Sequence, residues 1–314
     1  MFLLFPERVL IFSPPAWKQI AVEGCLHGEL DEVYASIRHV EKIEDVKIDL
    51  LIRCGDFQRV KNSLLGIDKP SIATTKISEY ELILEVLLWT RSSACSDYIY
   101  IGGNHDASNH LWELYYGGWA GPNIYFLVFS GVIKFVNIRI GGISGIYKQG
   151  HYHLGHFERP PFYESDLRSV YHIREYDVMK LKHINEPIDI FISHDWPVVV
   201  YEYGNLKRLV RRLIIVVLLQ IKKRTLGSLP AAELLNQHKP HKWFSGHIHC
   251  NFTAAIQRKK DESITRFVAL DKCVPGRKFL LIVDINSDPG PYEIRHDADW
   301  LVITRKFNSI FPLS

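Results

Sequence analysis

The sequence predicts an α/β fold, in which helices flank sheets of mixed strand direction. Two observations lead to this expectation. Short apolar segments recur along most of the 314 residues, and in the first third they alternate with segments of helical periodicity. Several of the apolar segments also end in glycine or a sharp turn that is followed by a polar side chain. At 47% hydrophobic and 23% charged residues, the composition is typical of a soluble globular chain with a large core.

Strands and helices alternate in the first part of the chain. Residues 20–22 form a short buried strand, and apolar side chains then recur at helical spacing over residues 30–40. Residues 49–52 are a second apolar strand, residues 77–90 have a helical pattern, and residues 98–101 are a third strand. This alternation is typical of parallel strands joined by helical connections.

The rest of the chain is richer in strands. Residues 123–143 are a series of strands separated by turn residues, and strands are also expected at 187–193 and 241–245. Two late strands follow at 269–271 and 279–285. Strands that end in a turn and a polar residue can converge on one point at the edge of a sheet. We therefore expect an α/β sandwich whose polar strand ends form a site.

Two stretches do not follow this pattern. Residues 147–171 are long, polar and aromatic, and a loop of that length inside a compact domain is usually functional or disordered. Residues 207–224 contain seven Lys or Arg residues and no acidic residue, around the apolar run 213–219. The default interpretation of this basic run is a solvated helix face.

Bulk properties restrict the classes of protein only loosely. A net charge of +3 gives no argument for nucleic-acid binding without a local basic patch. The five cysteines include no CxxC pair, which favours a reducing compartment. The apolar N-terminus is interrupted at residues 6–8 and lacks a convincing cleavage site, so we do not expect a targeting peptide. The run 213–219 is far too short to cross a membrane.

Five short motifs of metal-binding residues occur in order along the chain. They are GCLHG at 24–28, GD at 55–56, GNHD at 103–106, SHD at 193–195 and GHIH at 246–249. Taken singly, Cys25 could be a small buried hydrophobe, Asp56 a turn former or helix N-cap, and His194 the start of a helix. Five such motifs, each at the end of an apolar run, indicate a binuclear metal site.

The residue types suit hydrolysis of a phosphate ester. Two divalent ions about 3.5–4 Å apart can bind a phosphodiester and stabilise both the attacking and the leaving oxygen. Asp56 is the natural bridging carboxylate, and His247 and His249 can reach neighbouring metals from one tight turn. Asn104 offers an amide oxygen. His105 beside it can point at the substrate and protonate a departing alkoxide.

Together these motifs resemble the calcineurin-like metallophosphoesterases, and more closely their RNA lariat debranching branch. The branch-level resemblance extends over residues 18–305. It depends on longer stretches around the motifs, including GCLHGELD from residue 24, CGDFQ from 54, GGNHDASNHLWELYYGG from 102, SHDWP from 193 and ALDKC from 269. The cysteine in the first motif, where most two-metal phosphoesterases have aspartate, is itself a mark of this branch.

The resemblance implies a fold and a set of roles. The fold would be a four-layer αββα sandwich with an inserted recognition loop at about 147–171 and a small C-terminal β extension. Residues 1–17 would lie outside the fold, residues 18–255 would form the catalytic domain, and residues 256–314 would pack on it. One metal position would be held by Cys25, His27, Asp56 and His249, and the other by Asp56, Asn104, His194 and His247. His105 would be the general acid or transition-state stabiliser. The substrate would be contacted by Tyr147, His156, Phe157 and Arg168.

The implied activity is hydrolysis of the 2′-5′ phosphodiester at the branch point of excised intron lariats. An activated water would attack in line, and the 2′ oxygen would leave. The implied cofactors are two divalent ions (Fe²⁺, Zn²⁺ or Mn²⁺), the implied partner is branched intron RNA, and the implied location is the nucleus. No membrane association is expected, and no stable protein partner can be deduced.

Two other classes of function remain open. The chain could be another metallophosphoesterase, a nuclease or a phosphatase, although Asp56 is followed by Phe57-Gln58-Arg59 and not by the Arg-Gly expected of a protein phosphatase. It could also be a catalytically dead scaffold, although such proteins typically lose ligands and here every ligand position is filled. Departures from the branch are the apolar character of residues 210–219 and Gly276 where a histidine is usual.

Overall fold

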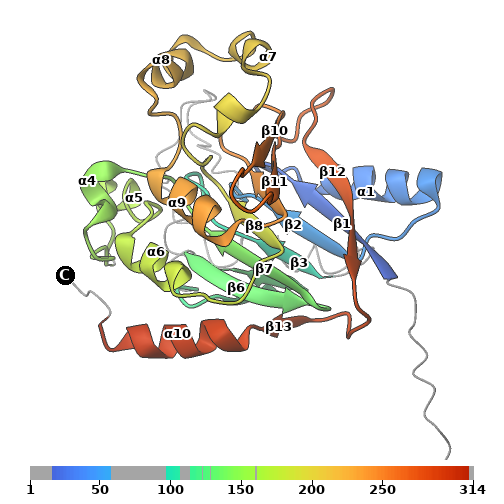
Figure 1. The fold of residues 1–314 in the computed structure, drawn as a ribbon, viewed down its shortest axis with the longest axis horizontal. Helices are drawn as coiled ribbons and strands as arrows, with labels where there is room; N and C mark the ends of the chain where they lie inside the picture. The colour runs from blue at the N-terminus through green and yellow to red at the C-terminus, as the bar shows by residue number, and fades with distance from the viewer. Residues whose placement is uncertain are drawn as a thin grey trace, which may run out of the picture.

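Two β-sheets packed face to face form the centre of the computed structural model, which describes residues 16–57, 97–106, 114–121, 123–127, 129–159 and 161–310 (Figure 1). Apolar side chains from both sheets meet in one buried cluster that includes Ile20, Ile99, Ile133 and Ile190. This packing confirms the predicted α/β sandwich. The expected helix at 77–90 lies outside the described residues.

The first sheet has the strand order β12-β1-β2-β3-β5-β4. The strands are β1 (Ala16–Glu23), β2 (Leu50–Arg53), β3 (Tyr98–Tyr100), β4 (Gly118–Gly121), β5 (Ile124–Phe126) and β12 (Leu280–Ser287). The four central strands run parallel, whereas β12 and β4 pair antiparallel at the two edges. Every residue of β2 and β3 is buried, as continuous apolar strands in a parallel sheet covered on both faces should be.

The second sheet has the order β10-β11-β9-β8-β7-β6-β13. Its strands are β6 (Ser130–Phe135), β7 (Ile138–Ile143), β8 (Ile190–Ser193), β9 (Lys242–Ser245), β10 (Phe252–Gln257), β11 (Ile264–Ala269) and β13 (Ile294–His296). The central strands β7, β8, β9 and β11 are parallel. The edge strand β10 alternates buried and exposed residues, so one of its faces remains in solvent.

Helices cover the outer face of each sheet. On the first sheet, α1 (Leu30–Glu44) buries Leu30, Val33 and Ile37. On the second lie α6 (Glu175–Lys182), α9 (Leu229–His238) and α10 (Ala298–Asn308), which share a core cluster with β8 and β9. Ser228 caps α9 by accepting a hydrogen bond from the backbone N–H of Ala231 at 3.1 Å. The order of layers is therefore helix, sheet, sheet, helix, as expected.

The ends of the fold differ from the sequence-based boundaries. β1 begins at Ala16, inside the segment 1–17 that was expected to lie outside the fold, because it pairs with β12 along its whole length up to Ala16 opposite Ser287. Residues 1–15 are outside the described part of the chain. The late strand expected at 269–271 is instead β11, which ends at Ala269.

The C-terminal part is integral to both sheets. The expected boundary after residue 255 falls within β10, and β11 lies between β9 and β10. β12 completes the first sheet beside β1, and β13 pairs with β6 in the second. Long-range strand pairing of this kind is invisible to a local sequence pattern, so the C-terminal part was expected to pack on a domain of which it is in fact a component.

The two irregular stretches are partly helical. The segment 147–171 contains the short helices α4 (Gln149–Tyr152) and α5 (Glu164–Leu167). The basic run contains α7 (Leu206–Val210) and α8 (Ile215–Lys223), which follow the 3₁₀ turn η1 (Val200–Tyr203) and stand out at one end of the molecule (Figure 1). Among the described helices none has the length and apolar character needed to cross a bilayer.

Candidate metal centre

The candidate metal ligands and the candidate catalytic residue His105 follow the carboxyl ends of five strands, each of which lies in the parallel part of its sheet. Cys25 and His27 follow β1, Asp56 follows β2, Asn104 and His105 follow β3, His194 follows β8, and His247 and His249 follow β9. Since β1, β2 and β3 belong to one sheet and β8 and β9 to the other, the site lies between the carboxyl ends of strands from both sheets.

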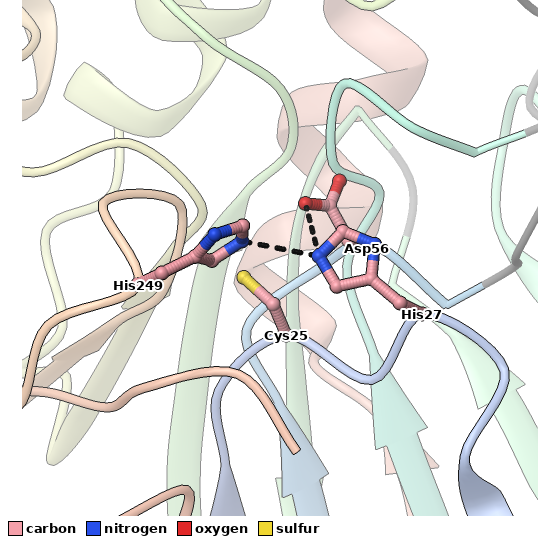
Figure 2. A group of neighbouring side chains, drawn as sticks. All are labelled: Cys25, His27, Asp56 and His249. Carbon is pink, nitrogen blue, oxygen red and sulfur yellow. Dashed lines mark hydrogen bonds and ion pairs between the residues drawn. The ribbon is translucent and has the colours of Figure 1, made fainter. Parts of the chain in front are cut away.

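Four of these side chains form one compact group (Figure 2). The ligand atoms of Cys25, His27, Asp56 and His249 all lie within 4.8 Å of one another. The Nε2 atom of His27 is 3.0 Å from Nε2 of His249 and 3.7 Å from Oδ2 of Asp56. Cys25 and Asp56 are fully buried, whereas the two histidines are partly exposed, so the group opens to solvent on the histidine side.

A second group shares Asp56. The Nε2 atom of His194 is 3.4 Å from Oδ1 of Asp56 and 3.0 Å from Oδ1 of Asn104, and its ring centroid is 5.0 Å from that of His247. The Nδ1 atom of His194 lies 2.7 Å from the carbonyl oxygen of Cys54. A carbonyl can only accept, so Nδ1 carries the proton and donates it, which leaves the lone pair of Nε2 facing Asp56 and Asn104.

Asp56 is a buried carboxylate that remains charged. Burial raises its pKa, but the imidazoles of His194, His105 and His27 lower it further, and the net pKa lies well below the usual range. Its Oδ1 accepts a hydrogen bond from the backbone N–H of His105 at 3.0 Å. Its Oδ2 is buried without a hydrogen bond from any described residue. A buried anionic oxygen without a hydrogen bond, 3.7 Å from Nε2 of His27, fits a bound divalent cation.

The histidines are held in the form that binds metals. Burial lowers the pKa of His27 and of His249 to about 4, and that of His247 to about 3, so all three are neutral at neutral pH. Burial, with Asp56 nearby, raises the pKa of the Cys25 thiol well above its ordinary value. The Sγ atom accepts the backbone N–H of His247 at 3.0 Å. A cation must therefore displace a proton to bind Cys25 as a thiolate.

The backbone at this site is strained. His27, Asp56, His247 and His249 have φ angles of 54°, 50°, 65° and 50°, in the left-handed region. Non-glycine residues are uncommon there, and each costs about 1–2 kcal/mol. Such strain is concentrated at functional sites, where the surrounding structure enforces it. Four of the candidate ligands share it, which supports a functional and not merely structural arrangement.

The close approach of Asp56 and His194 also requires glycine at two positions. A Cβ atom on Gly103 would overlap the carboxylate of Asp56 and lie 2.8 Å from the ring of His194. A Cβ atom on Gly55, whose φ is 110°, would also overlap the ring of His194. The glycines that accompany the ligand motifs therefore let Asp56 and His194 approach each other.

Comparison with known proteins places this geometry in a family. The profile of the calcineurin-like phosphoesterases matches residues 18–251, and the profile of the lariat debranching enzyme C-terminal domain matches residues 262–314. The lariat debranching enzyme of Arabidopsis thaliana is 54% identical over 300 residues, which cover 94% of this chain and 70% of that protein. The chain belongs to the lariat debranching enzyme family.

The human and Drosophila melanogaster relatives are longer than this chain. The lariat debranching enzyme of Homo sapiens is 45% identical over 302 residues, covering 94% of this chain and 55% of that protein. That of Drosophila melanogaster is 39% identical over 341 residues, covering 94% of this chain and 62% of that protein. The chain thus spans little more than half of the human relative.

The segment ALDKC of this debranching family member supports the first ligand loop. Lys272 forms a parallel bridge with Cys25, and the backbone N–H of Cys273 donates to the carbonyl oxygen of Cys25 at 3.0 Å. A Cβ atom on Gly24 would overlap the carbonyl oxygen of Asp271 and lie 2.9 Å from that of Leu270, so this close contact requires glycine. In the sequence this segment stood out only through the family resemblance. In the structure its contacts hold Cys25 in place.

Asp195 is a site residue that the sequence reasoning did not single out. It is buried, and burial raises the pKa of its carboxyl to about 6. It accepts backbone hydrogen bonds from Tyr147 at 3.2 Å and from Trp196 at 2.9 Å. The signal was its place directly after His194 in the SHD motif. Asp195 ties the start of the segment 147–171 to the metal centre.

The four expected substrate contacts are placed differently from one another. His156 is completely buried, with Nε2 2.6 Å from Oδ2 of Asp177, so it anchors the segment 147–171 to α6 and offers no surface to a substrate. Phe157 is 39% exposed, and Arg168 is exposed and ion-paired with a neighbouring glutamate. Tyr147 is half-buried and lines a cleft of about 540 Å³ together with His247 and His249. Of the four, only Tyr147 adjoins the candidate ligands in that cleft.

Proposed function

We propose that this protein hydrolyses the 2′-5′ phosphodiester bond at the branch point of excised lariat intron RNA and releases a linear RNA. The central observation is the complete set of candidate ligands at the strand ends, together with the buried Oδ2 atom of Asp56, which lies 3.7 Å from Nε2 of His27 and accepts no hydrogen bond from a described residue. The match of relatives that are themselves named lariat debranching enzymes supports the choice of substrate.

We assign two divalent cations to the site. One would be held by Cys25, His27, Asp56 and His249, and the other by Asp56, Asn104, His194 and His247. Two such ions bind a phosphodiester, activate water and stabilise the charge of the transition state. The donor set of thiolate and imidazole favours Zn²⁺ or Fe²⁺ at the first position over Mg²⁺, and Mn²⁺ is compatible with the second, which has only oxygen and nitrogen donors.

His105 is our candidate for the group that acts on the leaving oxygen. Its backbone N–H is bonded to Oδ1 of Asp56, which fixes its position beside the centre. Its ring lies edge-on to that of His27 at a centroid distance of 5.4 Å and is partly exposed. An imidazole placed there can hold a proton and donate it to the departing 2′ oxygen, or stabilise charge that develops on the phosphate.

A comparison of substrates tests the proposal. The protein, purified without oxygen and loaded with a divalent metal, is given a 2′-5′ branched RNA, the matching linear 3′-5′ RNA and a phosphopeptide. We expect cleavage of the branched bond, with Asp56→Asn as the inactive control. Equal rates on branched and linear RNA would indicate a nuclease. Activity on the phosphopeptide alone would indicate a phosphatase, and a folded protein without bound metal would indicate a scaffold.

The nucleus is the compartment that this function requires, because introns are excised there. Microscopy of the protein tagged at its natural locus would test this assignment, and exclusion of the tag from the nucleus would contradict it.

A further inference from the structure

The cleft beside the metal centre has an apolar wall that the catalytic residues do not explain. The cleft of about 540 Å³ is lined by the candidate ligands His247 and His249, and also by Leu213, Ile214 and Val217 from the segment that contains α8. That volume lies in the range of sites that enclose a small organic group such as a nucleotide. The wall is therefore continuous with the site of the proposed reaction.

The wall is anchored but still presents apolar surface. Leu213 and Val217 are partly buried and pack against the core beneath the second sheet, so they fix the segment on the protein. Ile214 between them is 70% exposed although it lines the cleft. A solvated helix face, the default interpretation of this run, would carry polar residues at such a position. Ile214 is one of four exposed apolar residues in this segment, with Ile215, Val216 and Leu219, and it is the one that lines the cleft; an exposed apolar group of this size marks an interaction site.

The charge around the wall identifies the chemistry of what covers it. Residues 206–224 contain seven Lys or Arg residues and no Asp or Glu. Only Arg224 of these has an ion-pair partner among the described residues, Glu202 at 2.7 Å. Arg212 is exposed and lines the cleft next to Leu213. An apolar surface edged by unpaired cations matches a single-stranded nucleotide, whose base has an apolar face and whose phosphate is anionic.

We propose that Leu213, Ile214 and Val217 form a subsite for a nucleobase of the RNA next to the scissile phosphate, and that Arg212 contacts the phosphate adjoining that base. This inference rests on the proposed function, since it takes the cleft as the path of the RNA. The subsite sets how tightly the branched RNA binds but does not take part in the chemical step. It therefore acts through KM for RNA and leaves small phosphodiesters unaffected.

Neighbouring residues give matched controls for the experiment. Ile214→Ser removes the apolar contact within the cleft, whereas Ile215→Ser changes a residue that is 75% exposed and does not line the cleft. Arg212→Gln and Arg211→Gln form a second pair, because both arginines are exposed and only Arg212 lines the cleft. Each variant is assayed on the branched RNA and on bis(p-nitrophenyl) phosphate, with thermal unfolding as the check on folding.

We expect Ile214→Ser to raise KM for branched RNA roughly fivefold or more, with little change in kcat, from the loss of apolar contact with a base. We expect Arg212→Gln to make the salt dependence of RNA binding shallower by about 0.7 in slope, as the loss of one phosphate contact predicts. The two control variants should match the wild type, and all four should hydrolyse the small diester at the wild-type rate.

The possible results distinguish failure of the nucleobase subsite from failure of the proposed debranching function. Equal KM values for Ile214→Ser and Ile215→Ser, in a wild type that opens branched RNA, overturn the subsite alone. A change in the rate on the small diester shows that the segment supports the centre itself, which also overturns it. A wild type that hydrolyses the small diester but not branched RNA overturns the proposed function and the subsite with it.

Discussion

Replacement of Gly103 by alanine should disable the metal centre without touching a ligand. The added Cβ atom would lie 2.5 Å from the backbone nitrogen of Asp56 and 2.8 Å from Cε1 of His194, and would overlap Oδ1 of Asp56. An ordinary contact of a Cβ atom is at least about 3.4 Å, so these groups must move by roughly 1 Å. Asp56 and His194 are both completely buried, and neither has free space to occupy.

The expected effect has two parts. Overpacking of this kind lowers the free energy of unfolding by about 1–3 kcal/mol. Displacement of the carboxylate shared by the two proposed metal positions should weaken metal binding by at least roughly 10- to 100-fold, the loss typical when a group that supports a ligand is removed. The first part is measured by urea unfolding of the metal-free protein, and the second by metal content after dialysis and by competition with a chelator.

Gly150 provides the matched control. It lies in α4 and is exposed, and a Cβ atom added there would meet no atom within 4 Å, so Gly150→Ala should leave metal binding unchanged. Alanine is favoured over glycine within a helix by about 0.5–1 kcal/mol, so a small gain in stability is also expected. If Gly103→Ala retained the full metal content and wild-type unfolding, the close approach at Gly103 would not be what positions Asp56, and the steric reasoning would fail.

Three further predictions follow from single contacts. His105→Ala should reduce turnover of branched RNA by at least about 100-fold while metal content stays intact, and loss of metal would instead assign that residue to the ligands. Cys25→Asp should shift metal preference from Zn²⁺ or Fe²⁺ toward Mn²⁺ and reduce inactivation by peroxide; an unchanged preference in competition assays would contradict this. Asp177→Asn should destabilise the protein by about 3 kcal/mol at pH 7, because it leaves buried Lys180 and His156 without their anion. Burial raises the pKa of Asp177 but Lys180 and His156 lower it further, so its contribution is present above about pH 4, where the carboxyl of the unfolded chain is ionised, and is lost as the pH falls. Urea unfolding should therefore show that the difference in free energy of unfolding between wild type and Asp177→Asn shrinks below pH 4. A difference that stays constant with pH would contradict the predicted direction of the pH dependence.

Local chemistry made the core of the site predictable. Apolar strands followed by glycine and a ligand residue are patterns within a few residues, and they are sufficient to place Cys25, Asp56 and His247 at strand ends. Their convergence follows from the rule that parallel strands end at one edge of a sheet. The strain at His27 and His249 is different, because the left-handed backbone there is imposed by surrounding contacts and leaves no mark in the sequence.

Features that depend on distant contacts were not predictable. A histidine in a polar, aromatic stretch suggested a substrate contact at His156, whereas its partner Asp177 lies in a different helix and draws it into the interior. The apolar run around Ile214 could not be assigned to the cleft, because its neighbours there come from the turn after β9 and from the segment after β7. The burial of His156 and the neighbours of Ile214 depend on contacts between residues distant in the sequence, which only the tertiary fold brings together.

The pairing of β1 with β12 has a consequence for how the protein is made. Trp17 lies opposite Asn286, so the strand that leads to Cys25 acquires one of its two neighbours only after about 270 further residues have been synthesised. Until then one edge of β1 exposes unpaired backbone groups that can pair with other chains. Closing so long a loop is also slow. We therefore expect the metal-binding loop to assemble only after β12 has been synthesised, and chains that terminate before residue 280 to aggregate.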